Sequence, residues 1–322
     1  MPTSRATSPG GTEHVAPPGR ILATGLGGFA GRHLGTALAE ILPGAELLPL
    51  DCDITDHAAV EARVRDLRPD ACIHLAAIAA IGVANSDPAR AWQVNLHGTL
   101  GLAAALSRHA PEAPLVYVSS ADAYGRSFAG GAALDESALL APINVYGATK
   151  AAADLALGAM PEPGAAGGLH VVRLRPFNHA GPGQSDDFAL SAFSRQVALI
   201  AAGRQAPVLQ AGNLDPERDF LDVRDVARAY ALAIARARTL PNRVILNLAS
   251  GKPRRIGAVL SDLVALAGVP VSVEPDPTRM RPSDIPRAVG NAARARDMLG
   301  WTPRIAWQQT LHDVLEDWKQ RV

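Results

Sequence analysis

The sequence predicts an α/β fold, a doubly wound parallel sheet with a smaller C-terminal lobe. Short apolar runs alternate with stretches of helical length along most of the 322 residues, which is the order typical of parallel βαβ units. A glycine-rich turn joins the first apolar run to the first helical stretch at residues 25–31. Breaker-rich loops at 125–143, 176–187 and 203–219 are expected outside the carboxyl ends of strands, where such sheets bind ligands.

The individual elements are predicted from apolar periodicity and from the residues that interrupt it. Apolar runs indicate strands at 20–24, 46–50, 71–75, 114–119, 169–174 and 244–248. Helical spacing indicates helices at 29–42, 57–67, 88–109, 144–159, 222–238 and 256–267, and a terminal helix that includes Trp318. We expect residues 20–175 plus 221–250 to form the sheet domain, and residues 176–220 plus 251–322 to form the smaller lobe. Residues 1–19 are rich in Pro, Gly, Ser and Thr and are expected to be a disordered extension.

Composition excludes several classes of function. A hydrophobic content of 48% suffices for a large core, and the net charge of zero leaves no basic surface for nucleic acid or an anionic membrane. The longest apolar stretch, 71–84, contains His74 and is too short to span a bilayer. Cys52 and Cys72 have no metal-type spacing, so we expect no metal and a reducing, cytoplasmic location.

The glycine-rich turn has the context of a nucleotide-binding loop, because a strand precedes it and a helix follows. Gly25 permits the tight turn, Gly28 lets the backbone approach a pyrophosphate, and Gly31 allows the helix to pack closely on the strand. The helix that begins near Phe29 and Ala30 points its amide groups at the phosphates. These residues predict a Rossmann-like domain that binds a dinucleotide.

The second apolar run ends at Asp51. A carboxylate at the end of the second strand typically binds the adenosine ribose, and its charge opposes a 2′-phosphate. Asp51 therefore slightly favours NAD(H). The alternative is that Asp53 is the carboxylate at the cofactor, in contact with the adenine, so the cofactor is predicted as NAD(P)H.

Tyr146 and Lys150 are four residues apart on a predicted helix, so they lie on one face of it. The Lys150 ammonium favours a phenolate, and we expect it to bring the pKa of Tyr146 down toward neutral. Ser120, at the end of a predicted strand, is expected to hydrogen-bond the same substrate oxygen. A site with these three residues can move a proton on or off an alcohol or a carbonyl.

The chain resembles the extended short-chain dehydrogenase/reductase superfamily over residues 20–320, because several short motifs occur in the order typical of that family. They are T-G-x-x-G-F-x-G at 24–31, His74-Leu75-Ala76-Ala77, Asn95 with Gly98-Thr99, Ser119-Ser120 with Tyr124-Gly125, Asn144 before Tyr146, and Lys150. The resemblance implies NAD(P)H as the cofactor and Ser120, Tyr146 and Lys150 as catalytic residues. It also implies cofactor contacts from Ile54, Leu75, Ala76, Ala77, Asn95, Tyr146 and Lys150.

Within this superfamily the chain is similar to the branch that acts on GDP-linked 6-deoxyhexoses. The similar segments are 175–184, 218–225 and 279–284. The resemblance implies a GDP-linked nucleotide-sugar substrate, bound by Asn178, His179, Arg218 and Arg281. The two arginines supply planar cationic forks for a diphosphate, and Asn178 offers an amide to a phosphate or sugar oxygen. His179 is either a sugar contact or a hydrogen-bonded structural residue.

Two activities of this branch differ just after the strand-end Ser. A dehydratase would carry Thr at Ser120 and Glu at Asp122, where the carboxylate serves as base at sugar C5. Asp122 is shorter by about 1.5 Å, and a misplacement of about an ångström costs on the order of a hundredfold in rate. The resemblance therefore favours reduction of the C4 keto group of a GDP-4-keto-6-deoxyhexose, with Asp122 as a fourth catalytic candidate. Dehydration of GDP-mannose, or another nucleotide-sugar epimerase or dehydratase reaction, is the alternative.

Two further expectations concern the class of protein and its assembly. A non-catalytic dinucleotide-binding protein is the other class considered, but Ser120, Tyr146 and Lys150 argue against it. The helices at 88–109 and 144–159 are Ala- and Leu-rich on more than one face. Pairing with a second copy as a four-helix bundle would bury that surface, so a homodimer is predicted.

Overall fold

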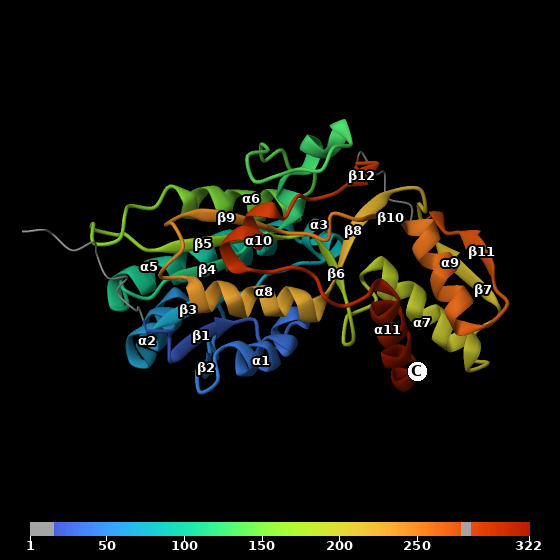
Figure 1. Ribbon diagram of the computed structural model, residues 1–322, viewed down its shortest axis with the longest axis horizontal. Helices are drawn as coiled ribbons and strands as arrows, with labels where there is room; N and C mark the ends of the chain where they lie inside the picture. Colours follow the sequence, from blue (N-terminus) through green and yellow to red (C-terminus); the bar gives the residue numbers. More distant parts are fainter. Residues whose placement is uncertain (1–15, 278–284) are drawn as a thin grey trace, which may run out of the picture.

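The computed structural model describes residues 16–277 and 285–322, and its largest feature is a parallel sheet with helices on both faces (Figure 1). The strands are β1 (Arg20–Thr24), β2 (Glu46–Pro49), β3 (Ala71–His74), β4 (Leu115–Val118), β5 (Val171–Pro176) and β9 (Val244–Leu248). Their order is β2-β1-β3-β4-β5-β9, and every pairing is parallel. The chain leaves β1 toward opposite sides to form β2 and β3, so the carboxyl ends of β1 and β3 border a topological switch point. The predicted fold class and all these strands are confirmed.

Helices cover both faces of the sheet, and its central strands β3 and β5 are buried throughout. One face packs against α1 (Phe29–Ile41) and α8 (Val223–Arg236). The other packs against α2 (His57–Leu67), α5 (Thr99–His109) and α6 (Val145–Gly158). The predicted helices at these positions are confirmed. In the described residues, all helices are too short or too polar to span a membrane.

The helix predicted at 88–109 is interrupted. It consists of α4 (Pro88–Trp92), a π-helical turn over Gln93–Gly98, and α5, and the short helix α3 (Ile81–Ser86) precedes it. The π-helical turn carries Asn95, which is 1% exposed and donates its amide to Ile78 O (3.1 Å) and Thr149 Oγ1 (2.9 Å). Single π-helical turns often occur at functional sites, and here the turn joins the helix to the loop after β3.

The smaller lobe has its own core between α7 (Ala189–Ala201), α9 (Ile256–Ala267) and α11 (Trp307–Arg321), at the right of Figure 1. Strands β7 (Val208–Ala211) and β11 (Ser272–Pro275) form a parallel pair beside these helices. The expectation of a loop at 203–219 is therefore wrong in part. Side chains alternate between buried and half-exposed along β7, but four residues are too few to stand out from the surrounding Pro and Gly.

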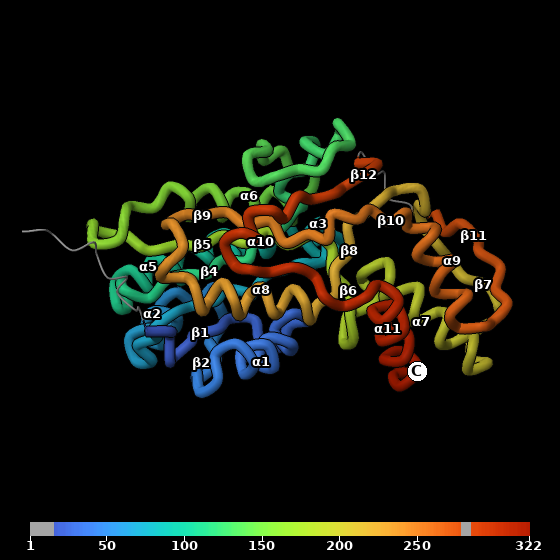
Figure 2. The backbone as a smooth tube through the Cα atoms, in the orientation of Figure 1, coloured from blue at the N-terminus to red at the C-terminus, as the bar shows by residue number. Residues whose placement is uncertain are grey.

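A second small sheet joins the two parts of the chain. It contains β6 (Asn178–Ala180), β8 (Glu217–Asp222), β10 (Pro253–Arg255) and β12 (Arg287–Ala288). The loop predicted at 176–187 thus begins with a short strand that pairs with β8. In Figure 2 the red segment runs back along the large sheet at α10 (Ala293–Leu299) before it forms α11. Trp301, which follows α10, lies in the core of the large sheet, although residues 251–322 are predicted to belong to the smaller lobe. The domain boundary at residue 251 therefore stays a prediction.

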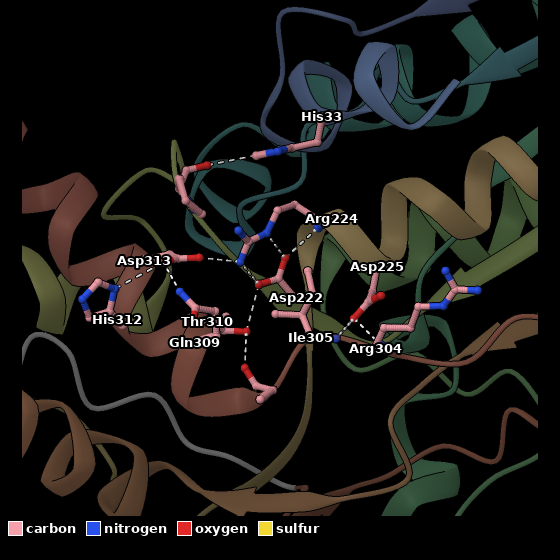
Figure 3. Close-up of polar contacts among 12 residues, drawn as sticks. His33, Asp222, Arg224, Asp225, Arg304, Ile305, Gln309, Thr310, His312 and Asp313 are labelled. Carbon is pink, nitrogen blue, oxygen red and sulfur yellow. Dashed lines mark hydrogen bonds and ion pairs between the residues drawn. The ribbon is translucent and has the colours of Figure 1, made fainter. Parts of the chain in front are cut away.

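A polar cluster at the start of α8 connects the large sheet to α11 (Figure 3). Buried Asp222 caps α8 by accepting the Arg224 backbone N–H at 2.8 Å, and it also accepts the Arg224 guanidinium at 2.7 and 2.8 Å. From α11, Thr310 donates to Asp222 Oδ2 at 2.9 Å, while Asp313 pairs with Arg224 at 2.7 Å. These contacts fix the smaller lobe against the end of β8, the strand that carries the predicted substrate residue Arg218.

Candidate active site

The glycine turn leaves no room for side chains on its inner face. Gly25 has a φ of +72°, and a Cβ there would lie 2.6 Å from Ala76 N. A Cβ on Gly31 would lie 2.4 Å from Gly25 O, which explains how closely α1 packs under the turn. A Cβ on Gly27 would meet nothing within 4 Å. The turn is therefore closed toward the protein and open on its outer face.

The open face lies at the start of α1. Gly28 caps this helix and donates its N–H to Gly25 O at 3.0 Å, and Phe29 and Ala30 follow as the first helical residues. The first amide groups of a helix attract phosphate. The donor set and the glycine cradle thus fit the pyrophosphate of a dinucleotide.

Thr24 fixes the loop after β3 beside the glycine turn. Its hydroxyl accepts the backbone N–H groups of Leu75 (3.1 Å) and Ala76 (3.0 Å), so it donates its proton to His74 Nδ1 at 2.6 Å. His74 Nε2 then donates to Thr99 Oγ1 at 2.9 Å. Burial, with Lys150 nearby, lowers the pKa of His74 to about 3, so its ring is neutral. His74 is thus a structural clamp that holds the predicted cofactor contacts at 75–77.

The two aspartates after β2 each have a partner. Asp51 forms an ion pair with Arg63 Nε at 2.7 Å, and its side chain is 60% exposed. Asp53 accepts the Thr55 backbone N–H (2.9 Å) and hydroxyl (2.8 Å) and pairs with Arg90 at 3.0 Å. These contacts lower the pKa of Asp53 to about 2, and the hydrogen bond from the Thr55 backbone N–H has the largest effect. Asp51 is thus the more accessible of the two, while Asp53 holds its own turn.

Two other predicted cofactor residues are buried. Ile54 is 6% exposed and its side chain belongs to the core with α2 and α5, so its cofactor contact stays a prediction. Asn95 accepts the Ile78 N–H at 2.8 Å in addition to its two donated bonds. Its amide is therefore used to hold the loop that contains Ala77, and a direct cofactor contact stays a prediction.

Ser120, Tyr146 and Lys150 lie together at the carboxyl end of β4. Ser120 follows the strand and caps a short 3-10 helix by accepting the Asp122 N–H at 3.1 Å. Tyr146 and Lys150 occupy the first two turns of α6, whose start Asn144 caps by accepting the Gly147 N–H at 2.7 Å. The Lys150 ammonium lies 4.4 Å from the ring centre of Tyr117 on β4. The structure therefore brings the three predicted groups to one strand end.

The expected lowering of the Tyr146 pKa is wrong for the cofactor-free protein. Burial, followed by the charge of Asp122, raises the pKa of Tyr146 above its usual value, and a hydrogen bond with Ser120 offsets only part of this. Burial also lowers the pKa of Lys150 to about 7. The site thus keeps the phenol protonated, which is the form that donates a proton.

Asp122 faces Ser120 and Arg218. The Ser120 hydroxyl donates to Asp122 Oδ2 at 3.2 Å. Burial raises the pKa of Asp122, although Ser120 and the charge of Arg218 oppose this. Arg218 on β8 donates to Glu217 O (2.8 Å) and Ile285 O (3.1 Å). A predicted substrate arginine therefore reaches the catalytic end of the site from the smaller lobe.

The remaining substrate candidates divide into two groups. Asn178 is exposed at the start of β6, where its side chain is accessible. His179 donates from Nδ1 to Phe177 O at 3.0 Å and stacks on Phe29 with ring centres 5.9 Å apart. It thus connects the smaller lobe to the glycine turn, a structural role that leaves a sugar contact untested. Arg281 lies outside the described residues.

Three charged residues beneath the site were not predicted. Asp154 on α6 pairs with Arg173 and Arg175 of β5, and all of them are buried. The sequence does contain a signal. An aspartate one turn after Lys150 in an Ala-rich helix, and arginines alternating with apolar residues in V-V-R-L-R-P, both place charge where core residues are expected.

The doubly wound sheet, the glycine turn and the Ser-Tyr-Lys group define a short-chain dehydrogenase/reductase of the extended type. The family model for GDP-mannose 4,6 dehydratase matches residues 43–314. GDP-6-deoxy-D-mannose reductase from Pseudomonas aeruginosa is 37% identical over 306 residues, which cover 94% of this chain and 98% of that protein. The chain therefore belongs to the GDP-mannose 4,6 dehydratase family of NAD(P)-dependent extended short-chain dehydrogenase/reductase enzymes.

Solved structures agree with this membership. RMD from Pseudomonas aeruginosa in complex with NADPH matches with a TM-score of 0.84 and 36% identity, covering 94% of this chain and 99% of that one. UDP-glucose 4-epimerase from Thermus thermophilus in complex with NAD matches with a TM-score of 0.79 and 27% identity, covering 94% and 100%. The large sheet and the smaller lobe thus follow an arrangement shared across nucleotide-sugar enzymes.

Proposed function

We propose that the protein reduces the C4 keto group of GDP-4-keto-6-deoxy-D-mannose with NAD(P)H, to GDP-D-rhamnose or its C4 epimer. The observation that carries the proposal is the place of Tyr146 beside Ser120 at a strand end, next to a glycine turn that fits a dinucleotide, and burial raises the pKa of the Tyr146 phenol there. The similarity to GDP-6-deoxy-D-mannose reductase supports the choice of substrate. A proton from Tyr146 and a hydride from a nicotinamide dinucleotide together reduce a carbonyl to an alcohol.

The residues of the site would divide the work as follows. Gly25, Gly28 and the start of α1 hold the pyrophosphate, and the bound nicotinamide supplies hydride to C4. Tyr146 donates its proton to the oxygen on C4, and Ser120 hydrogen-bonds that oxygen. Lys150, when charged, stabilises the phenolate left on Tyr146 and holds the nicotinamide ribose.

The position of Asp122 favours reduction over dehydration. A dehydratase needs a carboxylate that reaches C5 of the sugar, and Asp122 is short and turned toward Ser120 at 3.2 Å. Burial also raises the pKa of Asp122, which disfavours the charged form that a base requires. GDP-mannose 4,6-dehydratase activity remains the second candidate function, because the family model carries that description.

A direct assay separates the two candidates. The protein is incubated with NADH or NADPH and GDP-4-keto-6-deoxy-D-mannose made by a separate dehydratase, and loss of reduced nicotinamide absorbance is followed. A reductase consumes reduced cofactor only when the keto sugar is present. Conversion of GDP-mannose itself, without consumption of reduced cofactor, would assign the dehydratase activity instead.

Asp51 leads us to expect a higher kcat/KM with NADH than with NADPH. Its carboxylate is accessible at the end of β2, and a 2′-phosphate beside it would be repelled. Asp51→Ser should move the ratio toward NADPH, whereas Arg63→Gln, which exposes the full charge of Asp51, should move it further toward NADH. Kinetics with both cofactors decide the point, and a wild-type preference for NADPH that Asp51→Ser leaves unaltered would show that Asp51 points away from the ribose.

We further propose a homodimer through α5 and α6. Leu155 on α6 is 59% exposed, and Ala148 and Ala152 on the same face are only partly buried. Ala104 on α5 is also exposed. Burying such a stripe against its symmetry copy would form the four-helix bundle expected from the sequence.

Leu155→Glu is expected to convert the dimer to monomer, because the charge would be buried at the centre of the bundle. Light scattering during size-exclusion chromatography measures this. Leu266→Glu on α9 is the matched control, since Leu266 is also exposed at 43% but lies outside the proposed interface. Equal masses for wild type and Leu155→Glu would contradict the interface.

The free cysteines Cys52 and Cys72 suit a reducing compartment, so we place the enzyme in the cytoplasm. For the domains we retain residues 20–175 plus 221–250 for the dinucleotide and residues 176–220 plus 251–322 for the nucleotide-sugar. The separate core of α7, α9 and α11 supports the second unit.

A further inference from the structure

A buried ionic cluster lies beneath the catalytic pair. Asp154 follows Lys150 by one turn of α6, so Tyr146, Lys150 and Asp154 share one face of the helix. Asp154 is 0% exposed and Lys150 is 3% exposed. The helix thus carries a proton donor, a cation and a carboxylate in succession from the cleft to the core.

Asp154 is held rigidly by two arginines of β5. Arg173 Nη1 donates to its Oδ1 at 3.0 Å, and Arg175 donates from Nη2 to Oδ1 and from Nε to Oδ2, both at 2.9 Å. Gly158, on the next turn of α6, makes room for this arrangement, because a Cβ there would lie 2.4 Å from Arg173 Nη1. Burial raises the pKa of Asp154, but the hydrogen bonds and charges of Arg175 and Arg173 keep this pKa below its usual value.

The other titratable groups that face Lys150 are neutral near pH 7. Burial raises the pKa of Tyr117 on β4 and of Tyr146 on α6, and it lowers the pKa of His74 on β3 to about 3. Within the described residues that surround Lys150, the charge is therefore set by Asp154 and its two arginines. The charge of Asp122, which Arg218 opposes, acts on Tyr146.

We propose that Asp154 is a positioning residue of the reductase, which holds Lys150 in its charged form beside Tyr146 from its place one helical turn below. The inference rests on the proposed function, since it assigns a role within that same site. Burial alone favours the neutral amine, and the Asp154 carboxylate opposes this effect. Arg173 and Arg175 weaken this effect of Asp154 on Lys150, because both arginines pair with the single negative charge of the carboxylate.

The pH dependence of kcat tests this role, because the direction in which each variant shifts the alkaline limb is predicted. A negative charge raises the pKa of an amine and of a phenol alike, so Asp154→Asn should move the alkaline limb of kcat to lower pH, whether Lys150 or Tyr146 titrates. The expected shift is on the order of one pH unit. Arg173→Gln removes a positive charge and should move the limb to higher pH by a smaller amount. The double variant restores the original net charge and should return the limb toward wild type.

A second measurement does not depend on activity. The sequence has three lysines, Lys150, Lys252 and Lys319, so protein labelled with ¹³C-lysine has few side-chain signals. Lys252→Arg and Lys319→Arg assign them. Titration of the Lys150 Cε signal in cofactor-free protein should show a lower pKa in Asp154→Asn and a higher one in Arg173→Gln. Failure of the proposed reductase activity would leave this titration interpretable.

Two further variants complete the test. Glu162→Gln removes the same charge at an exposed ion pair with Arg243 and should shift neither the limb nor the signal. Asp154→Glu keeps the negative charge, so Lys150 should titrate in this variant as it does in the wild type. If Asp154→Asn does not fold, Asp154→Glu and Arg173→Gln together make the test. An unchanged Lys150 titration in Asp154→Asn would overturn the role, as would shifts of the same sign in Asp154→Asn and Arg173→Gln. If only Asp154→Glu and Arg173→Gln fold, no upward shift in Arg173→Gln would overturn it.

Discussion

Tyr146→Phe is expected to lower kcat for the keto sugar by at least about a hundredfold, the usual scale of general acid catalysis. Burial raises the pKa of the Tyr146 phenol, which favours its protonated form, and phenylalanine keeps the ring while removing the hydroxyl proton. Cofactor affinity, measured by quenching of protein fluorescence, should be unchanged. Steady-state kinetics of reduced cofactor consumption give the comparison.

A matched control distinguishes chemistry from packing. Tyr124 is 0% exposed, accepts a hydrogen bond from Arg175 at 3.0 Å and donates one to Asn247 at 2.7 Å. Tyr124→Phe removes the same hydroxyl from the core, so it should lower the unfolding midpoint and reduce kcat much less than Tyr146→Phe does. Near-normal turnover in Tyr146→Phe would remove that residue from the mechanism.

Arg218→Ala is expected to raise KM for the nucleotide-sugar by about ten- to a hundredfold, because a charge-assisted contact with a phosphate contributes roughly 1.5–3 kcal/mol. KM for the nicotinamide cofactor should change far less. Arg218→Lys should rescue poorly, since an ammonium cannot reproduce a bidentate fork. The same result is expected for Arg281→Ala, although Arg281 lies outside the described residues.

Arg287→Ala is the control for Arg218. Arg287 lies on the neighbouring strand β12, where it pairs with Glu217 at 3.0 Å and is 41% exposed. It should leave nucleotide binding intact. Calorimetry with GDP measures affinity directly, and unchanged binding in both Arg218→Ala and Arg281→Ala would reject the diphosphate assignment.

The large sheet was predictable because its signals are local. Each strand is an apolar run, and Gly25 and Gly31 occupy positions that no side chain could fill. The smaller lobe was less predictable because β6, β10 and β12 have only two or three residues each and depend on pairing with β8. The helix α7 also went unpredicted, since the adjoining Pro- and Gly-rich loops obscured its apolar face.

The candidate site shows the same division. Tyr146 and Lys150 were predicted from their spacing and Ser120 from its place after a strand, and the fold brings the three together. The protonation of Tyr146 was predicted wrongly because helical spacing accounts for Lys150 but not for burial or for Asp122. Asp154 was missed because its partners Arg173 and Arg175 come from a strand about twenty residues later, a contact that only the tertiary fold creates.

Transfer of deuterium from the cofactor tests the central claim most directly. The protein is given GDP-4-keto-6-deoxy-D-mannose and NADH or NADPH deuterated at the transferred position of the nicotinamide, and the product sugar is examined by NMR. The proposed reductase places deuterium on C4 of a 6-deoxyhexose, and the H4 couplings of a parallel product made with undeuterated cofactor identify rhamnose or 6-deoxytalose. A product without deuterium at C4, or formation of the keto sugar from GDP-mannose by this protein alone, would contradict the reductase assignment.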